Sequence, residues 1–226
     1  MKNFIYIGLV LLAAACNSND HPSLNLLVNG SAEVPKYDSI PPGWQNVQGH
    51  WVTLEGDSTH HDFGFAKEGH HYFFAGNDTL GVLQQDVNVS DYADGIDANK
   101  QSFVFSGYAQ SLDQGPNSDQ AMITIKGLDN SKNKTLYTFI SDTTRSIGKW
   151  LQVRDSFVAP ISTRFIRVQL IAIRHVGGDN DGYFDNILLT TKSTGSAFDK
   201  KWLFIAIAIV LVIAIGFFIY KKRKRG

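Results

Sequence analysis

An acidic, glycine-rich stretch near the end of the chain carries the densest group of side chains that could do chemistry. Five oxygen-bearing side chains fall within eight residues: Asp179, Asn180, Asp181, Asp185 and Asn186. Glycines at 177, 178 and 182 let the backbone turn tightly around them. Carboxylates and turn carbonyls are the oxygen ligands that Ca²⁺ takes in sets of about six to eight. A solvated acidic turn that binds nothing has the same composition, so both interpretations stay open.

Aromatic rings and polar side chains in the expected loops are the candidates for ligand binding. Rings can stack on the faces of sugars, and charged groups can bond sugar hydroxyls. The stacking candidates are Trp44, Trp51, Tyr72, Tyr108 and Trp150, and the hydrogen-bonding candidates are Arg145, Arg174, Asp113 and Asp119. Trp44 and Trp150 could equally close the ends of a β domain.

No catalytic constellation stands out in the sequence. It contains neither a Gly-X-Ser-X-Gly elbow, nor a phosphate-cradling loop, nor a His-Glu-X-X-His motif. The neighbouring pairs His60-His61 and His70-His71 would point to opposite faces of a strand, so a pair rarely chelates one ion. We therefore predict that the protein is not an enzyme and that its histidines lie in loops without a transition metal.

Short alternating segments must position these side chains. Apolar and polar positions alternate in 82–89, 121–126 and 165–173, and clusters of Gly, Asn, Asp and Pro separate the segments. This pattern predicts an all-β domain of two packed antiparallel sheets, a jelly-roll sandwich over residues 21–191. The expected strands are 26–29, 44–47, 50–54, 72–75, 82–89, 103–109, 121–126, 135–140, 151–158, 165–173 and 184–190, with a short helical turn at 90–97 capped by Ser90.

The charge distribution limits the partners. From His21 to Asp199 the chain has 13 lysines and arginines against 20 aspartates and glutamates, a balance of −7. An acidic domain without a basic stripe argues against nucleic-acid binding. Cys16 is the single cysteine, which excludes an internal disulfide.

The N-terminal end has the layout of a secretory signal over residues 1–15. An apolar run from 4 to 12 leads into Ala13-Ala-Ala-Cys16, and polar residues follow. Small residues before a cysteine resemble the lipobox of bacterial lipoproteins, although Ala13 stands where Leu is usual. The expectation is a lipidated Cys16 in an exported protein. Ordinary signal cleavage, with Cys16 incidental, is the alternative.

The C-terminal end reads as a membrane span. Residues 202–220 are 19 in number and carry no charge, which is long enough to cross a hydrocarbon core of about 30 Å. Trp202 and Tyr220 stand at its ends, and the five cations of 221–225 follow it. We predict a linker at 192–201, one transmembrane helix at 202–220 and a cytoplasmic tail at 221–226. Removal of the helix by a sorting protease is the alternative.

A set of short motifs in order resembles the galactose-binding-like β-sandwich of bacterial surface proteins and carbohydrate-binding modules. The motifs are Asn25-Leu-Leu-Val-Asn-Gly-Ser-Ala-Glu33, Pro42-Gly-Trp44, Tyr72-Phe-Phe-Ala-Gly76, Leu83-Gln-Gln-Asp-Val87, Phe105-Ser-Gly-Tyr108 and Asn180-Asp-Gly-Tyr-Phe-Asp-Asn-Ile-Leu188. They cover nearly the whole expected exported region. The resemblance is more specific for the fold than for a ligand.

The same resemblance implies a structural Ca²⁺ that joins the first strand to the last. Glu33 and Asp185 would supply carboxylate oxygens, with Asp181 as a further ligand. A sandwich usually brings its termini together, so we expect these side chains to face a common gap.

Two functions of different classes follow. The first is a membrane-displayed module that binds carbohydrate or a cell-surface glycan, through Trp51, Tyr72, Tyr108, Asp113, Arg145 and Arg174. The second is a structural or assembly component that contacts another envelope protein. Loop aromatics favour the first, and the acidic charge with two lipid-facing ends favours the second.

Overall fold

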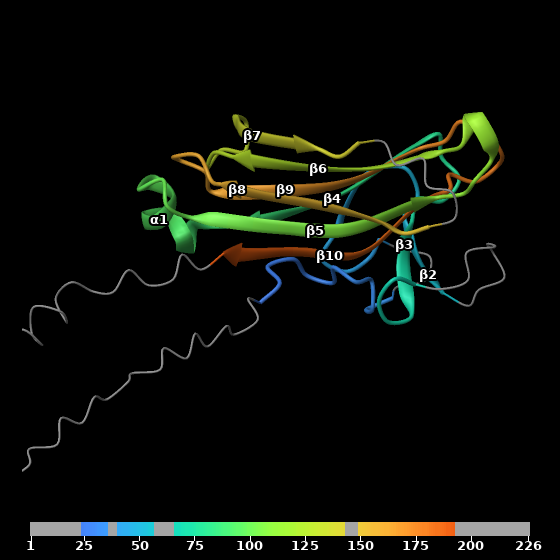
Figure 1. Ribbon diagram of the computed structural model, residues 1–226, viewed down its shortest axis with the longest axis horizontal. Helices are drawn as coiled ribbons and strands as arrows, with labels where there is room; N and C mark the ends of the chain where they lie inside the picture. Colours follow the sequence, from blue (N-terminus) through green and yellow to red (C-terminus); the bar gives the residue numbers. More distant parts are fainter. Residues whose placement is uncertain (1–23, 36–39, 57–65, 143–148, 193–226) are drawn as a thin grey trace, which may run out of the picture.

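Ten strands form two five-stranded antiparallel sheets in the computed structural model, which describes residues 24–35, 40–56, 66–142 and 149–192 (Figure 1). Sheet A has the order β1-β4-β9-β6-β7, and sheet B has the order β2-β3-β10-β5-β8. The strands of sheet A are β1 (Gln45–Gln48), β4 (Leu80–Asn88), β6 (Gln120–Leu128), β7 (Thr135–Ile140) and β9 (Phe165–Ile173). Those of sheet B are β2 (Val52–Glu55), β3 (His71–Phe74), β5 (Ser102–Ser111), β8 (Leu151–Val158) and β10 (Gly182–Lys192). The predicted two-sheet antiparallel sandwich is confirmed.

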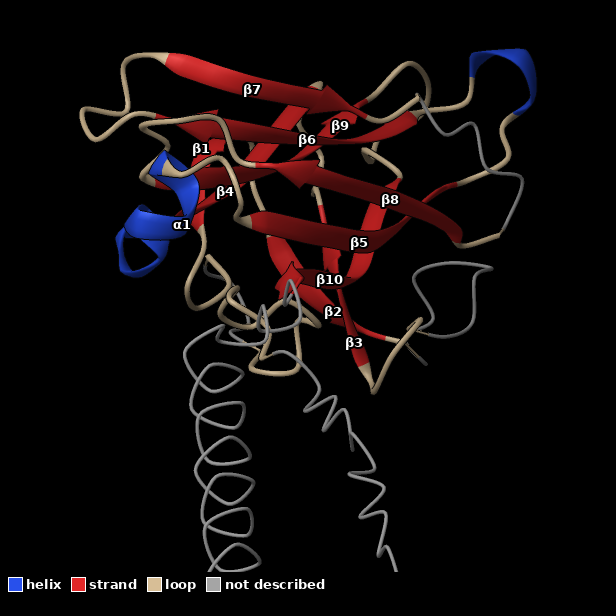
Figure 2. Cartoon of the chain, turned by 60° about the vertical axis from the view of Figure 1, so that its left-hand side comes forward, coloured by secondary structure: helices blue, strands red, loops and turns tan. Residues whose placement is uncertain are grey.

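Alternation along the strands builds the core between the sheets. Ile166, Val168 and Leu170 of β9 are fully buried on the inner face. Phe105 and Phe184 of sheet B are also fully buried and belong to the same cluster. Burying aromatic and branched side chains at about 25 cal/mol per Å² is the main stabilising term of such a sandwich. Figure 2 shows the two layers from the side, with sheet A above sheet B.

A short helical segment follows β4, as predicted, but its cap differs. The turn consists of a 3₁₀ segment (Ser90–Tyr92) and the helix α1 (Ala93–Asp97). Ser90 makes no side-chain cap. Instead, the side chain of Asn88 accepts a hydrogen bond from the Ser90 backbone N–H at 2.9 Å. The capping residue is therefore Asn88, two residues before the predicted Ser90, because the 3₁₀ turn begins at Ser90 itself.

The predicted first strand at 26–29 is wrong. This segment runs beside β10 as a series of turns, with Asn29 and Ala32 in the left-handed region at φ of 51° and 58°. Two backbone bonds attach it to β10: Leu26 N–H to the Leu189 carbonyl at 2.8 Å and Ile187 N–H to the Gly30 carbonyl at 2.9 Å. A Cβ at Gly30 would collide with the carbonyl of Ile187, so glycine is required for this close approach. The expected proximity of the first and last segments is nevertheless present.

The predicted ends of the chain lie outside the described residues. These are the signal segment at 1–15 with Cys16, the helix at 202–220 and the tail at 221–226. None of the helices in the described part of the chain is long and apolar enough to cross a bilayer.

Asn25 should be a large contributor to the stability of the N-terminal segment. Its Nδ2 donates to the Ile187 carbonyl at 3.0 Å, and its Oδ1 accepts from Leu189 N–H at 2.9 Å and Leu27 N–H at 3.1 Å. Asn25→Ala leaves these backbone groups without a partner, so we expect it to lower the free energy of unfolding by about 1–3 kcal/mol. Urea denaturation measures this, with Leu24→Ala, at an 84% exposed position, as the control. Equal losses in the two variants would contradict the assignment.

Candidate functional site

The outer face of sheet B carries a second aromatic cluster, separate from the core. Tyr72 and Phe74 of β3 and Tyr183 of β10 form it, and they are only 5%, 5% and 1% exposed. Phe74 stacks on Tyr183 with ring centroids 5.6 Å apart, and Tyr72 meets Tyr183 edge-on at 5.7 Å. Trp150 packs against Tyr72 at 6.2 Å. The outer face of an antiparallel sheet is commonly solvated, so this covered cluster marks the face as unusual. We call these four residues the aromatic face.

Asp181 is hydrogen-bonded to the aromatic face. Its Oδ1 accepts the Tyr183 hydroxyl at 2.6 Å, and its Oδ2 accepts the side-chain amide of Gln114 at 3.1 Å. Burial and the bond to Asp181 raise the pKa of Tyr183 well above its ordinary value, so the phenol stays protonated and keeps donating.

A fully buried carboxylate holds the acidic, glycine-rich loop. Oδ1 of Asp119 accepts the backbone N–H groups of His175 at 2.7 Å and Val176 at 3.2 Å, and its Oδ2 accepts that of Asp181 at 2.9 Å. Asp119 is therefore a structural anchor for this loop. The neighbouring Asn180, also fully buried, donates its side-chain amide to the Asp78 and Ala172 carbonyls at 3.0 and 3.1 Å.

A pair of carboxylates, from Glu33 and Asp185, holds the loop before β3. Oε1 of Glu33 accepts the N–H groups of His70 and His71, both at 2.8 Å. Oδ2 of Asp185 accepts those of Lys67 at 2.6 Å and Glu68 at 2.8 Å. Two of the three predicted calcium ligands thus meet at one segment, residues 66–71, which we call the clamped loop.

The pKa values of the two carboxyls that hold the clamped loop are shifted in opposite directions. Burial raises the pKa of Asp185 to about 7, although backbone N–H groups of Glu68, Asn186 and Lys67 lower it, and Glu68 adds like-charge repulsion. Burial opposes ionisation of Glu33 as well, but the N–H groups of His71 and His70 bring its pKa below the ordinary value. His71 Nδ1 lies 3.6 Å from Glu33 Oε2, which is an electrostatic contact and too long for a hydrogen bond.

The predicted three-carboxylate calcium set is not assembled. Asp181 is bonded on the aromatic face and precedes Asp185 by four residues, about 13 Å along an extended strand. Within the described segments, no group of three or more His, Cys, Asp or Glu side chains is placed to hold a metal ion. Calcium stays a prediction for Glu33 and Asp185 only, and backbone carbonyls would have to supply most of the about six to eight oxygens.

The predicted sugar-binding residues are scattered. Trp51 is 1% exposed, and its indole N–H donates to the Gln48 carbonyl at 3.2 Å, so its ring offers no face to a ligand. Arg174 Nη1 is bonded to the carbonyls of Asn77 and Gly178. Asp113 closes its own turn through the Gly115 N–H at 3.0 Å. Arg145 lies outside the described residues.

Tyr72 and Tyr108 are brought to the same face of sheet B. Tyr108 stands opposite Asp185 in β10 and opposite Gln152 in β8. The ammonium group of Lys67 lies 4.6 Å from the centre of the Tyr108 ring, a cation–π contact with the clamped loop. Tyr72 is nearly buried, whereas Tyr108 is half-buried.

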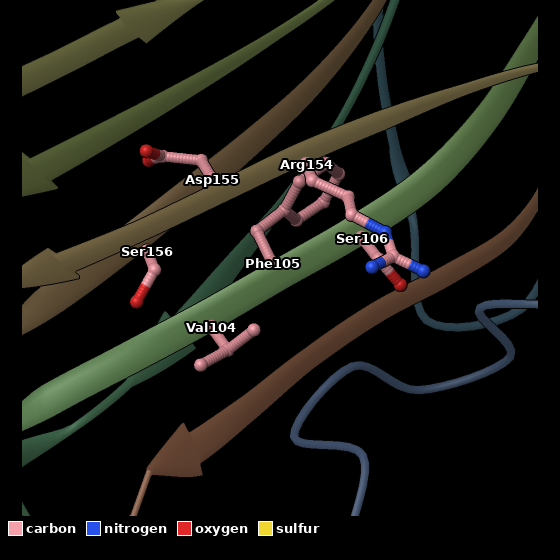
Figure 3. A pocket seen from close by; sticks show the side chains of 6 residues that line it. All are labelled: Val104, Phe105, Ser106, Arg154, Asp155 and Ser156. Atoms are coloured by element: carbon pink, nitrogen blue, oxygen red, sulfur yellow. The ribbon is translucent and has the colours of Figure 1, made fainter.

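A surface depression continues the same face beyond Tyr108. It has a volume of about 530 Å³ and is lined by Val104, Phe105, Ser106, Arg154, Asp155 and Ser156 (Figure 3). The register places Ser106 opposite Arg154 and Val104 opposite Ser156. In Figure 3 the Arg154 guanidinium reaches over β5 toward Ser106, whereas Asp155 points away. We call this the β5–β8 depression.

Arg154, Ser106 and Ser156 are not among the predicted binding residues, because the ligand site was expected in loops. Their strands were predicted, and the alternation of polar and apolar residues in β8 was the available signal. Val153 and Phe157 are buried, so Arg154 and Ser156 had to face outward.

Asp185 should make stability depend on pH. Its folded pKa of about 7 exceeds the roughly 3.9 of an unfolded aspartate. The folded state therefore binds more protons between these values, and stability falls as pH rises through 7. For a buried group this difference corresponds to at most about 4 kcal/mol. In chelator we expect a lower Tm at pH 8 than at pH 5, and Asp185→Asn should reduce that fall.

Calcium provides the second arm of this experiment. Millimolar Ca²⁺ at pH 8 should raise the Tm if Glu33 and Asp185 hold the ion, because a cation favours the ionised carboxyl, and Glu33→Gln should then remove the increase. If Ca²⁺ does not change the Tm, Glu33 and Asp185 hold the clamped loop through backbone N–H groups alone. An equal fall between pH 5 and pH 8 in wild type and Asp185→Asn would contradict the role of Asp185.

Comparisons with known proteins identify the fold. Neither a protein-family model nor a curated protein matches the sequence. Among solved structures, a family 16 carbohydrate-binding module has 18% identity and a TM-score of 0.50, covering 74% of this chain and 99% of its own. The module TmCBM61, solved with beta-1,4-galactotriose, has 13% identity and a TM-score of 0.50 over 75% and 100%.

A cyclase from Fischerella sp. TAU is equally similar, with 12% identity and a TM-score of 0.50 over 75% of this chain and 97% of its own. The fold therefore does not decide between binding and catalysis. The predicted resemblance is confirmed at the level of the fold: the described chain has the two-sheet antiparallel β-sandwich fold of these carbohydrate-binding modules.

Proposed function

We propose that this protein is a non-catalytic carbohydrate-binding module whose ligand face is the outer surface of sheet B. One observation carries the proposal: a guanidinium, two hydroxyls and a half-exposed tyrosine ring lie on one face of the neighbouring strands β5 and β8. Tyr108 and Ser106 are alternate residues of one strand, about 7 Å apart and on the same face. Arg154 of β8 stands opposite Ser106, and Ser156 stands opposite Val104, two residues further along β5.

This arrangement suits the chemistry of a sugar. The Tyr108 ring can take the apolar face of a pyranose, while the Arg154 guanidinium can donate two parallel bonds to neighbouring hydroxyls. Ser106 and Ser156 both donate and accept, which matches hydroxyl groups. The aromatic face beside them keeps β3 and β10 fixed, so the contact surface is formed before a ligand arrives. The similar module that was solved with a galactotriose supports the choice of ligand class.

Arg154→Ala should weaken glycan binding at least about tenfold, because a charge-assisted hydrogen bond contributes about 1.5–3 kcal/mol. Tyr108→Phe should bind nearly as wild type, and Tyr108→Ala should lose affinity with the ring. A glycan array identifies the ligand, and calorimetry measures each variant.

Lys126→Ala on the outer face of sheet A is the matched control, since it removes the same charge from the other layer. Binding should be competed by the free sugar. If no glycan binds, or if Arg154→Ala and Lys126→Ala behave alike, this site is not a carbohydrate site, and a structural envelope role becomes the better account.

We also propose that the module is exported and held at the membrane. The signal-like segment at 1–15, Cys16 in its small-residue context, and the uncharged run at 202–220 followed by five cations support this orientation. The membrane lipid is then a partner at both ends of the chain, and the tail at 221–226 is cytoplasmic.

Protease added to intact spheroplasts should digest the sandwich and spare the tail, because only the sandwich is exposed outside. Cys16→Ser should abolish labelling with a fatty-acid analogue. Protection of the sandwich from protease would overturn the orientation, and unchanged labelling of the variant would overturn the lipidation of Cys16.

A further inference from the structure

Exposed apolar side chains gather on the N-terminal segment of the described chain. Single exposed apolar residues are normal on a protein surface, whereas a group of them marks a binding surface. Of the ten large apolar side chains that are exposed in the described residues, four lie between positions 24 and 40. They are Leu24, Val28, Val34 and Ile40, with exposed fractions of 84%, 59%, 56% and 44%. We call these four residues the N-terminal apolar patch.

The patch faces away from the sandwich because other residues of the same segment pack inward. Leu27 and Ala32 are buried and belong to the core cluster between the sheets. Glu33 is the single charged residue in 24–35, and its Oε1 is bonded to the clamped loop. Figure 1 shows the segment, in blue, beside β10 on the side away from sheet A. Its outward surface is therefore apolar, with one partly exposed carboxylate.

The backbone groups of both exposed valines are satisfied within the protein. Val28 N–H donates to Gln85 Oε1 at 2.7 Å, and the Val28 carbonyl accepts Gln85 Nε2 at 3.0 Å. Asn29 bonds Val34 in the same way, accepting its N–H at 2.9 Å and donating to its carbonyl at 3.2 Å. A surface that leaves water must carry no unpaired backbone group with it. Val28 and Val34 meet this condition.

The core holds the patch in place before any partner arrives. Gly43 lies directly against Val28, since a Cβ at Gly43 would be 2.7 Å from Val28 Cγ1. The buried indole of Trp44 donates its N–H to the Asn29 carbonyl at 3.2 Å. Ile40 precedes Gly43 by three residues, so the patch continues into this turn.

Both ends of the described chain lie at the patch. The hydrogen bond from Leu26 N–H to the Leu189 carbonyl, at 2.8 Å, places Leu24 beside the last residues of β10, which ends at Lys192. Cys16 is eight positions before Leu24, and the uncharged C-terminal run begins ten positions after Lys192. At no more than about 3.6 Å per residue, these stretches reach at most about 29 Å and about 36 Å.

We propose that the N-terminal apolar patch lies on the outer surface of the lipid bilayer, with its aliphatic side chains among the headgroups. This inference rests on the proposed export and membrane attachment of the chain. Attachment keeps the patch close to the bilayer at a high effective concentration, so a few aliphatic contacts are enough. A shallow insertion of about 5–10 Å suits side chains of this size. Exposed Lys192 beside the patch can meet lipid phosphates.

Quenching of a fluorescent label by lipid-borne nitroxides tests the docking in the full chain. In a Cys16→Ser background, Val28→Cys is the single cysteine and takes the label, and the C-terminal helix alone holds the chain in phosphatidylcholine vesicles. The control is Val176→Cys, another exposed valine, which shares the Asp119 carboxylate with Asp181 at the start of β10. The seven residues of β10 between Gly182 and Leu189 separate the two labels by about 23 Å. We expect quenching at 28 to be at least about fivefold stronger than at 176, since insertion is about 5–10 Å deep.

Substitutions within the patch show whether its side chains make the contact. Val34→Asp should at least roughly halve the quenching of the label at 28, because moving a carboxylate out of water is unfavourable. Val34→Leu should keep the quenching, and Val176→Asp, at the distant site, should leave it unchanged. These positions are exposed, so an unchanged Tm of each variant confirms that the sandwich is folded.

The possible failures are distinguishable. A chain that does not float with the vesicles would overturn the membrane attachment and the docking together. A chain that floats while the labels at 28 and 176 are equally quenched would overturn the docking alone. Self-quenching of the label at 28 with rising chain density, without quenching by lipid, would assign the patch to contacts between copies instead. An unchanged signal after Val34→Asp would overturn the assignment to this patch. None of these results depends on glycan binding.

Discussion

A buried carboxyl group needs hydrogen-bond donors around it, and this requirement determines much of the structure. Asp119 and Asp185 are both fully buried, and isolated buried charges are among the most unfavourable groups in a protein. Each is surrounded by backbone N–H groups of a loop, three for Asp119 and three for Asp185 when the bond from Asn186 at 2.6 Å is included. The loops take their shape because they must supply these donors.

The position of β10 explains why both loops shape the proposed ligand face. β10 lies in the middle of sheet B, between β3 and β5, and carries Asp185 and Tyr183 on its outer face. The clamped loop leads into β3 and brings Lys67 over Tyr108, and the loop held by Asp119 leads into β10 itself. The two loops that border the outer face of sheet B are therefore held by the buried carboxyl groups of Asp119 and Asp185. The β5–β8 depression is the accessible continuation of this face.

Alternation in the sequence predicted most of the strands and their buried faces. The bounds of β7, β8 and β9 agree residue for residue with the predicted 135–140, 151–158 and 165–173. β8 and β9 alternate with a period of two, whereas β7 contains a register shift. The 26–29 segment failed because its apolar run is interrupted by side-chain bonds from Asn25 and by left-handed residues, which no periodicity reveals.

Site residues were harder to predict because their roles depend on tertiary partners. Asp181 and Asp185 look alike in the sequence, yet one accepts a tyrosine hydroxyl and the other clamps a distant loop. Trp51 is like any surface tryptophan in its local sequence, but it packs on Phe184 in the core with ring centroids 5.8 Å apart. Glu33 and Asp185 both accept N–H groups of the clamped loop, because the first and last described segments lie side by side.

Amide hydrogen exchange is the most direct measurement of the central claim that buried carboxylates hold the loops through their N–H groups. The amides to follow by NMR are those of Lys67, Glu68, His70, His71, His175, Val176 and Asp181. We expect protection comparable to that of amides in β10, although all of these residues except His71 lie outside the strands. Exchange at the rates of an unprotected peptide would contradict it.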